Sequence, residues 1–540
     1  MKREIYLSIL MSWMIGNTVI YAQGEMDAFR ISQTDLNGTA RYLGMSGAFG
    51  ALGGDISAMT TNPGGLAIYR SSEVVATASF LSIKTQSDWN GSVMDADRVR
   101  FNFDNVAYVG HFRTGKDDGI LAWNLGVSYN RIKDFNRSYH VNGMQAFSVA
   151  DYMADLAYGI KAISLDKENV STAYLEDNPW LAILGYRAGF FEPYNDKKDE
   201  YHSSFGHAVN GQWEAYSPQN VKLQVREKGY IGRYNISLAT NVSNKFFLGA
   251  TLSIVDAHYK ISTKYTEDFS LTDYGWLDNE FSTSGAGLAV NLGAIYHLND
   301  FLRVGIAYNS PTWFIDIMDE AHASAETIIN NESWNGGVHK TPGYQSDLYY
   351  LRTPTRWVFS LAGIGTNFLL STDYELSNYK RMRLYDVDDG GRYDYQATDD
   401  IKMDFGVSGN LKVGAELKFT PQFSIRAGFL WRTSPMKQHM KDGIPPRKPD
   451  GTYYVDAVGV VGTLPNYTID KGINSYSLGL GYRFTPKFFV DIACVYREHK
   501  EDVYAFPGTF LPDGTPFVKS VPASLKTKTT QVALTLGYKF

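Results

Sequence analysis

The last ten residues of the chain, 531–540, alternate strictly between apolar side chains and small or polar ones. One face is apolar and ends in an aromatic residue: Val532, Leu534, Leu536, Tyr538 and Phe540. The other face includes Thr535 and Gly537. Because successive side chains of a β-strand point to opposite faces, this period of two predicts a strand with one apolar face. That face must meet either a soluble core or the hydrocarbon of a membrane.

The same alternation recurs along the chain, for example in residues 121–130, 246–254, 302–309 and 476–484, and the second face is repeatedly small or polar. Tyr or Phe often stands near the ends of the apolar face, as in the aromatic belts at the two membrane interfaces. We therefore predict an all-β fold, a transmembrane antiparallel β-barrel of about fourteen strands, an even number as in single-chain bacterial barrels. The strands are expected to start near Glu73, Phe103, Gly119, Gly229, Lys245, Ser284, Phe301, Thr355, Phe368, Met403, Phe423, Ser475, Phe488 and Thr527.

The connections between these strands sort by parity. After even strands they are tight: 114–119, 241–244, 298–300, 363–366, 420–422 and 485–487. After odd strands they are long, including roughly 132–228, 310–354, 377–400, 434–474 and 498–526. Short periplasmic turns and long extracellular loops are typical of a transmembrane barrel. A soluble β-protein has no reason to separate its loops in this way.

Composition agrees with a barrel and excludes several other classes. The mean hydropathy is only −0.25, but a barrel strand needs apolar residues at every second position alone, and the 37 Tyr, 30 Phe and 50 Gly suit aromatic belts and a small inner face. A net charge of −6 gives no reason to expect a nucleic-acid partner. The single cysteine, Cys494, excludes an internal disulfide and a multi-cysteine metal site. No metal and no cofactor is expected.

The ten histidines are scattered and lie mostly in predicted loops. Hydrolases built on barrels need a Ser or Asp held beside a His on adjacent strands. None of these histidines forms a recognisable pair with a Ser across predicted neighbouring strands. We therefore expect no catalytic residues, and the protein is not predicted to be an enzyme.

The N-terminus has the pattern of a secretory signal peptide, expected at residues 1–22. Lys2 and Arg3 form a short positive region, an apolar run follows, and Ala22 stands where signal peptidase would cut. A transmembrane anchor is the alternative, but polar residues interrupt the run, and a membrane-spanning helix needs about 20 predominantly apolar residues. Export in this way agrees with location in the outer membrane of a Gram-negative-type cell.

Residues 23–72 do not alternate, and small residues dominate them. Asp55 is placed to cap a short helix through Ala58 and Met59, and Pro63 disfavours helical geometry at Asn62, where that helix should stop. Such a compact segment would fit inside a narrow barrel, where bulky side chains would clash with the wall. A flexible periplasmic tail is the alternative. We expect a plug at 23–72, followed by a barrel at 73–540.

This segment resembles the FadL/TodX family of outer-membrane transporters for long-chain fatty acids and other hydrophobic compounds. The resemblance lies in the small-residue run 44–54, in residues 55–58, in 62–66, and in the strand pair linked by residues 244–252. In that family an Asn-Pro-Ala motif lies in an N-terminal hatch that closes a fourteen-stranded barrel. Here Gly64 replaces the alanine. The resemblance implies that the hatch motif comprises Asp55, Asn62, Pro63 and Gly64.

The family's mechanism implies passive transport of a hydrophobic, fatty-acid-like ligand by a monomer in contact with outer-membrane lipid. The ligand would be captured by apolar loops, pass to a site in the lumen, and leave when the hatch moves. A terminal aromatic such as Phe540 is also typical of outer-membrane barrels. Two alternatives stay open: a non-transporting accessory or shuttle barrel of a protein secretion system, and a simple porin.

The expected loop 132–228 contains an apolar capture surface or a small cap with a core of its own. Residues 149–156 have helical spacing, and residues 180–191 are apolar on nearly every side. An extracellular loop should be polar, so this composition needs a reason. The loop is predicted to be partly helical, and its candidate ligand-binding residues are Trp180, Leu181, Leu184, Arg187, Phe190 and Phe191. The guanidinium of Arg187 could pair with a carboxylate head group.

Overall fold

The computed structural model describes residues 24–166, 173–174, 178–194, 197–334, 337–345, 348–386, 396–460 and 462–540. The expected signal peptide, residues 1–22, lies outside the described residues. Among the residues that are described, no helix combines the length and the apolar composition needed to cross a membrane.

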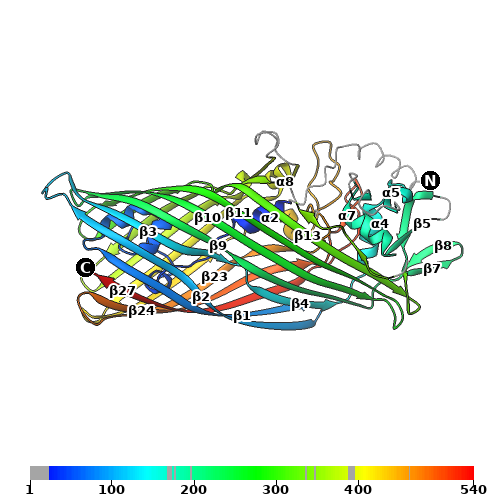
Figure 1. Ribbon diagram of the computed structural model, residues 1–540, viewed down its shortest axis with the longest axis horizontal. Helices are drawn as coiled ribbons and strands as arrows, with labels where there is room; N and C mark the ends of the chain where they lie inside the picture. Colours follow the sequence, from blue (N-terminus) through cyan, green and yellow to red (C-terminus); the bar gives the residue numbers. More distant parts are fainter. Residues whose placement is uncertain are drawn as a thin grey trace.

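The chain forms a closed antiparallel barrel with fourteen strand positions around its wall (Figure 1), which confirms the predicted fold class. The first strand pairs with the last from Glu73 opposite Lys539 to Asp88 opposite Ser524, so the sheet has no free edge there. The strands are β1 (Glu73–Trp89), β2 (Ser92–Arg113), β3 (Ile120–Asp134) with β4 (Arg137–Gly143), β9 (Asn220–Val242), β10 (Phe246–Asp268), β11 (Tyr274–His297), β12 (Leu302–Asn309) with β13 (Trp313–Ile329), β17 (Tyr349–Arg352) with β18 (Arg356–Ile364), β19 (Phe368–Asn378) with β20 (Arg383–Asp386), β21 (Val407–Lys418), β22 (Phe423–Arg432), β23 (Tyr467–Arg483), β24 (Phe488–Tyr504) and β27 (Ala523–Lys539).

Several strands extend further on the extracellular side than the alternation predicts. β2 begins at Ser92 rather than near Phe103, and β9 begins at Asn220 rather than near Gly229. As a result the β1–β2 tip is a tight turn at Asn90 and Gly91, both with left-handed φ. β11 likewise begins at Tyr274 rather than near Ser284, so residues 269–273 alone join β10 to β11. Above the membrane, outward positions need not be apolar. Pairing therefore continues where the sequence pattern fades.

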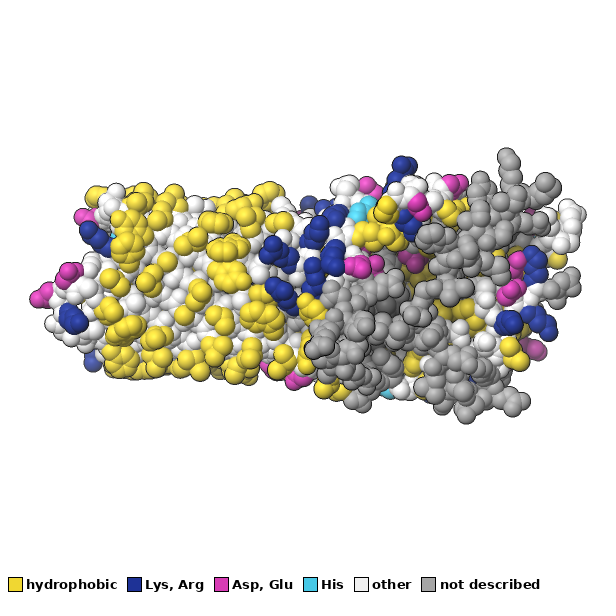
Figure 2. Space-filling model, turned by 90° about the horizontal axis from the view of Figure 1, so that it is seen from above, with side chains coloured by type: hydrophobic (Ala, Val, Ile, Leu, Met, Phe, Trp, Pro, Cys, Tyr) yellow, Lys and Arg dark blue, Asp and Glu magenta, His cyan; other side chains and the backbone are white. Residues whose placement is uncertain are grey.

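On the face that Figure 2 shows, the outer surface has an apolar half that ends at a group of Lys and Arg side chains. The apolar half lies beside the short turns and the C-terminus, and its outward residues include Ile236 at 58% exposure and Leu478 at 65%. β10 has 23 residues. At about 3.3 Å per residue and a tilt near 40°, such a strand rises roughly 58 Å, about twice the hydrocarbon thickness. The upper half of the barrel therefore projects beyond the membrane.

Residues 24–72, here called the lumen segment, lie inside the barrel (Figure 1). The segment contains helices α2 (Glu25–Ser32) and α3 (Ala40–Gly44) and the 3₁₀ helices η1 (Ile56–Thr60) and η2 (Pro63–Ile68). η2 contacts β9, β10 and β11, while α3 contacts β23, β24 and β27. These contacts reach strands on separate parts of the wall, so the segment crosses the lumen from side to side.

A second body of structure, here called the cap, is built from the chain between β4 and β9. Its described elements are α4 (Val149–Leu156), α5 (Ala162–Leu165), α7 (Trp180–Arg187), β5 (Phe191–Tyr194), β6 (Lys197–Ser203), β7 (Gly206–Val209) and β8 (Gln212–Ala215). It lies at the extracellular end (Figure 1). The remaining short elements are β14 (Glu332–Ser333), β15 (His339–Lys340), β16 (Tyr344–Gln345), η4 (Tyr379–Arg381), α8 (Gln396–Asp404), α9 (Gln438–Asp442), β25 (Thr509–Phe510) and β26 (Pro516–Val518).

Candidate functional site

Asp55 organises the lumen segment from within, as its position in the sequence predicts. Its carboxylate accepts hydrogen bonds from the Ser57 amide at 2.9 Å and from the Thr39 hydroxyl at 2.7 and 2.9 Å. It therefore caps η1, which runs through Ala58 and Met59 and ends before Asn62. The expected helix is present, although in 3₁₀ rather than α geometry. Thr39 in turn caps α3, so one carboxylate ties two helices together.

Asn62 and Gly64 hold the segment against the wall. The Asn62 amide nitrogen donates to the Gly50 carbonyl at 2.6 Å and to the Ala294 carbonyl of β11 at 3.1 Å, while its amide oxygen accepts from the Gly64 amide at 3.0 Å. A Cβ on Gly64 would lie 2.8 Å from the Phe247 carbonyl oxygen. The departure from alanine at this position is therefore matched by a wall that leaves no room for a methyl group.

The wall has glycines at the positions where the lumen segment contacts it most closely. A Cβ on Gly249 would overlap the Pro63 carbonyl, and one on Gly293 would overlap the Asn62 side chain. On the opposite part of the wall, Gly44 and Gly479 meet with only 3.1 Å from the Cα of one to the Cβ position of the other. The small inner face seen in the sequence thus allows backbone to approach backbone.

Buried charges fix the lower part of the segment. The Arg41 guanidinium lies 3.0 Å from Glu416, and Glu416 also pairs at 2.6 Å with Arg426, which pairs with Asp491 at 2.5 Å. On another part of the wall, Asp373 accepts hydrogen bonds from the amides of residues 49 and 50 at 3.1 and 2.9 Å. Because a buried charge is costly without a partner, these pairs oppose removal of the segment.

Above α3 the lumen contains a small cavity of about 70 Å³. Its charged lining consists of five cationic side chains and two carboxylates: Arg233, Arg356, Lys412, Arg432, Arg497, Asp35 and Glu375. The Glu375 carboxylate forms ion pairs with Lys412 at 3.0 Å and with Arg356 at 3.8 Å. Arg233 is only 4% exposed, and within the described part of the chain it forms no ion pair. The cavity therefore has excess positive charge with one buried cation uncompensated.

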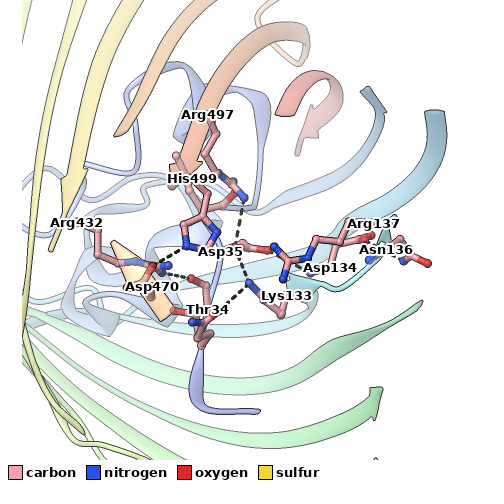
Figure 3. Close-up of polar contacts among 12 residues, drawn as sticks. Thr34, Asp35, Lys133, Asp134, Asn136, Arg137, Arg432, Asp470, Arg497 and His499 are labelled. Atoms are coloured by element: carbon pink, nitrogen blue, oxygen red, sulfur yellow. Dashed lines mark hydrogen bonds and ion pairs between the residues drawn. The ribbon is translucent and has the colours of Figure 1, made fainter. Parts of the chain in front are cut away.

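Residues 34–36 of the lumen segment occupy much of this cationic surface (Figure 3). The Asp35 carboxylate lies 3.2 Å from the Lys133 ammonium and 3.3 Å from the Arg497 guanidinium, and Arg432 donates to the Thr34 carbonyl at 2.9 Å. Burial alone would raise the pKa of Asp35, but Lys133, Arg497 and Arg432 outweigh it and hold that pKa well below its usual range. The chain itself thus supplies the anion that these cations bind.

The same short stretch bridges a seam in the wall. Pairing of β2 with β3 ends at Asn105 opposite Asn130, beside a bulge in β2 at Asp104. Asp35 donates its amide to the Ile132 carbonyl of β3 at 2.7 Å, and two residues later Asn37 donates to Asp104 of β2 at 3.0 Å. The lumen segment therefore contacts both strands where their direct pairing stops.

The candidate ligand residues of the cap are packed in its interior. Leu181, Leu184, Phe190 and Phe191 are each at most 3% exposed. The Phe191 ring lies 5.2 Å from the Tyr201 ring, and the Trp180 ring lies 4.8 Å from Tyr174. Arg187 ends α7. The structure buries the first four of these residues in one core, as the alternative interpretation expects, whereas Trp180 and Arg187 are half-buried, and the binding role of all six stays a prediction.

Sequence reasoning missed the cationic cavity, although a signal was present. Arg233, Arg356, Lys412, Arg432 and Arg497 all stand at inward positions of their strands. Other inward charges, such as Glu416, Arg426 and Asp491, have ion-pair partners inside the barrel. Charged residues at inward positions near the upper end of the apolar belt could therefore have marked the site.

Comparison with known proteins supports the fold at low sequence identity. No family model matches the chain. It is 23% identical to a 47 kDa outer membrane protein of Pasteurella multocida over 265 residues (47% of this chain, 50% of that protein). It is 22% identical to Outer membrane protein P1 of Haemophilus influenzae over 220 residues (40% and 39%). The matches thus span half of the first relative's length and less of the second's.

Among solved structures, a deletion mutant of the monoaromatic hydrocarbon channel TodX superposes with a TM-score of 0.51 at 12% identity, covering 94% of this chain and all of that chain. A Pseudomonas aeruginosa FadL homologue gives a TM-score of 0.49 at 13% identity, covering 94% and 99%. The resemblance drawn from the sequence is therefore confirmed at the level of the fold: the chain is a β-barrel of the outer-membrane type.

Proposed function

We propose that this protein is a passive outer-membrane transporter of hydrophobic small molecules that carry an anionic head group, with long-chain fatty acids as the model substrate. The observation that carries the proposal is the buried cavity in which Arg233 lacks an ion-pair partner among the described residues, beside Arg356, Arg432 and Arg497. A carboxylate would supply the missing counter-charge and could accept paired hydrogen bonds from a guanidinium. A purely apolar solute gains nothing from such a lining.

The size of the cavity supports entry of a head group rather than a whole lipid. A volume of about 70 Å³ corresponds to roughly two water molecules, since each occupies about 30 Å³ in the liquid. A long acyl chain therefore needs additional space. Displacement of the lumen segment would provide it, because residues 34–36 border the cavity.

Competition for the same cations offers a physical cause for that displacement. A ligand carboxylate reaching Arg497 and Arg432 would replace the Asp35 carboxylate and the Thr34 carbonyl. Release of Asp35 and Asn37 would also remove their contacts with β3 and β2 at the seam. The freed seam would give an apolar chain a side route toward the bilayer that avoids the polar lumen.

In this proposal the lumen segment acts as a hatch, and Asp55, Asn62, Pro63 and Gly64 keep its lower part folded while residues 33–37 move. The cap would make the first contact with the substrate. Its core residues Trp180, Leu181, Leu184, Arg187, Phe190 and Phe191 would then accept a chain only if the packing around them opens, since four of them are nearly inaccessible.

Binding of a matched acid and alcohol tests the head-group requirement. Purified protein in a non-ionic detergent is titrated with palmitic acid and with hexadecanol, and the Arg233→Gln variant is compared with Arg113→Gln at the exposed periplasmic end of β2. We expect Arg233→Gln to lose about tenfold in affinity for the acid and to bind the alcohol unchanged, since a charge-assisted hydrogen bond contributes about 1.5–3 kcal/mol. Arg113→Gln should match the wild type.

Equal binding of acid and alcohol by the wild type would contradict the head-group requirement. Transport itself is tested by uptake of labelled palmitate into cells that depend on this barrel. A folded barrel that supports no uptake and co-purifies stoichiometrically with secretion components would instead favour the accessory role. A high, ligand-independent conductance in planar bilayers would favour a simple porin, whereas the filled lumen leads us to expect a low one.

A further inference from the structure

Lysines stand immediately above the apolar belt on three neighbouring strands of the outer wall. On β1 the outward residues run from Phe80, which is 60% exposed, through Ser82 to Lys84. On β27 they run from Val532 upward through Thr530 to Lys528 and Lys526. Figure 2 shows, on the face it views, that Lys and Arg side chains also gather where the apolar surface ends.

The strand register places these lysines directly opposite one another. Lys84 faces Lys528 across β1 and β27, and Lys526 faces Lys500 across β27 and β24. Glu498 lies 3.4 Å from Lys500 and stands opposite Lys528 across β24 and β27, and Asp97 stands opposite Lys84 on β2. Within the described ranges, Lys84, Lys526 and Lys528 form no ion pair.

A second group repeats the arrangement on β9 and β10. Lys228 faces Lys260 directly, one outward step above Tyr230 and His258. Lys260 pairs with Glu280, whereas Lys228 forms no ion pair with any residue that the structure describes. The six residues Lys84, Lys228, Lys260, Lys500, Lys526 and Lys528 are here called the basic collar.

Like charges directly opposite one another destabilise a strand pair. In the part of the chain that the structure describes, the six lysines have only three acidic neighbours, Asp97, Glu498 and Glu280, so the three pairs leave positive charge above the belt that calls for an external counter-charge. Their height suggests where it comes from. Four residues beyond Phe80, at about 3.3 Å per residue and a tilt near 40°, place Lys84 roughly 10 Å above the last apolar ring. The headgroup region of a bilayer leaflet extends about 5–7 Å beyond the hydrocarbon, and lysine side chains reach toward it.

We propose that the basic collar binds phosphate groups on lipid headgroups of the outer leaflet. The lysine pairs would share these phosphates, so that lipid removes the repulsion that the register imposes. A lipid fits this surface better than a soluble partner, because the collar follows the upper edge of the apolar belt on separate strands rather than forming one compact patch. The inference is independent of what the barrel transports.

Spin-labelled lipids test the collar directly. The full protein is reconstituted in dioleoyl-phosphatidylcholine, and electron paramagnetic resonance measures the preference of its surface for spin-labelled phosphatidic acid over spin-labelled phosphatidylcholine. We expect the wild type to prefer the phosphate-bearing lipid, and the Lys84→Gln/Lys526→Gln/Lys528→Gln variant to lose at least about fivefold of that preference, the factor for one basic residue near an anionic surface. Raising the salt concentration should reduce the wild-type preference.

Two further variants distinguish loss of the basic collar from loss of positive charge elsewhere and from damage to the fold. Lys245→Gln/Lys418→Gln/Lys487→Gln removes the same charge from exposed positions at the periplasmic end and should keep most of the preference. Lys84→Arg/Lys526→Arg/Lys528→Arg keeps the charge and should keep the preference as well. The proposal is overturned if the wild type shows no preference, if both glutamine variants lose it equally, or if the collar glutamine variant retains it.

Discussion

The lumen segment lies inside the barrel and the cap lies at its extracellular end, and different interactions hold the two regions in place. The lumen segment meets the wall backbone to backbone at glycines such as Gly249 and Gly293, and hydrogen bonds and ion pairs to the wall add to the packing of its buried apolar side chains. The cap is built around buried aromatic and aliphatic side chains, with the Phe191 and Tyr201 ring centroids 5.2 Å apart. One body is fitted to its surroundings, and the other is largely fitted to itself.

This difference predicts how each region responds to change. A core of large side chains loses stability when one is truncated, because a cavity remains. A backbone contact between glycines is instead sensitive to addition of a single methyl group, because nothing nearby can move aside. Truncation should therefore damage the cap, enlargement should damage the lumen segment, and neither should unfold the membrane wall.

The largest effect is expected from Phe190→Ala in the cap. Phe190 is fully buried, and removal of a buried Phe side chain costs about 3–5 kcal/mol. The cap should become sensitive to limited proteolysis while the barrel keeps its heat-modifiable migration on a gel. Leu271→Ala, at a fully exposed position in the β10–β11 tip, should change neither property. Loss of the barrel together with the cap would show that the two regions are not separable.

The attachment of the cap should also depend on pH, in a direction set by Glu267. This residue lies near the extracellular end of β10, above the apolar belt, and accepts hydrogen bonds from the Ser148 hydroxyl and the Val149 amide of the cap. Burial raises the pKa of Glu267 to about 7, although these hydrogen bonds and that from Tyr265 oppose the shift and Asp151 adds to it. A raised pKa means that the stabilisation is complete below about pH 4.5 and is lost as pH rises through about 7.

We therefore expect the cap to loosen between pH 5 and pH 8, by up to about 3 kcal/mol. A spin label on Ile163→Cys, at a position 74% exposed on the cap, would report this as increased mobility in a Cys494→Ala background. Glu267→Gln should flatten the response. Burial also raises the pKa values of Asp151 and Asp155 of α4 to about 6, and both act in the same direction. The Glu267→Gln variant should therefore keep a smaller pH response. Unchanged wild-type mobility would contradict the assignment.

A smaller effect is expected from Gly64→Ala, which tests the fit of the lumen segment. The added methyl group would lie 2.8 Å from the Phe247 carbonyl oxygen, and overpacking of this kind costs about 1–3 kcal/mol. Channel conductance should rise because the segment is held less firmly. Gly363→Ala provides the matched control, since no atom lies within 4 Å of its Cβ position. Equal conductance of the two variants would show that the contact between Gly64 and the wall does not hold the segment in place.

The smallest effect is expected from Tyr42→Phe. The Tyr42 hydroxyl lies 2.8 Å from the Thr61 hydroxyl inside the lumen segment, and its loss should cost about 1 kcal/mol in urea unfolding of the segment. Tyr496→Phe on the lipid-facing wall should cost nothing measurable. A loss above about 3 kcal/mol for Tyr42→Phe would mean that packing around the ring, rather than the hydrogen bond, holds the segment.

Much of the wall could be predicted because the membrane imposes a rule on every second residue. Val532, Leu534 and Leu536 must face lipid, so their spacing reveals both the strand and its orientation. Asp55 and Pro63 likewise reveal a local helix start and stop, because capping and proline geometry act within a few residues. The extracellular ends of β2 and β9 were missed, because strand pairing there continues without an apolar face to mark it.

The sequence alone thus determined the barrel, the number and orientation of its strands, and the small residues that allow a segment inside it, since each rests on local spacing. Only the tertiary structure decided that Arg233, Arg356 and Arg497 share one cavity, that Asp35 pairs with Arg497 and Lys133, and that residues 35–37 span the β2–β3 seam. These contacts join residues more than sixty positions apart in the chain. Electrostatic pairing across a lumen depends on the closure of the whole barrel, which no local pattern encodes.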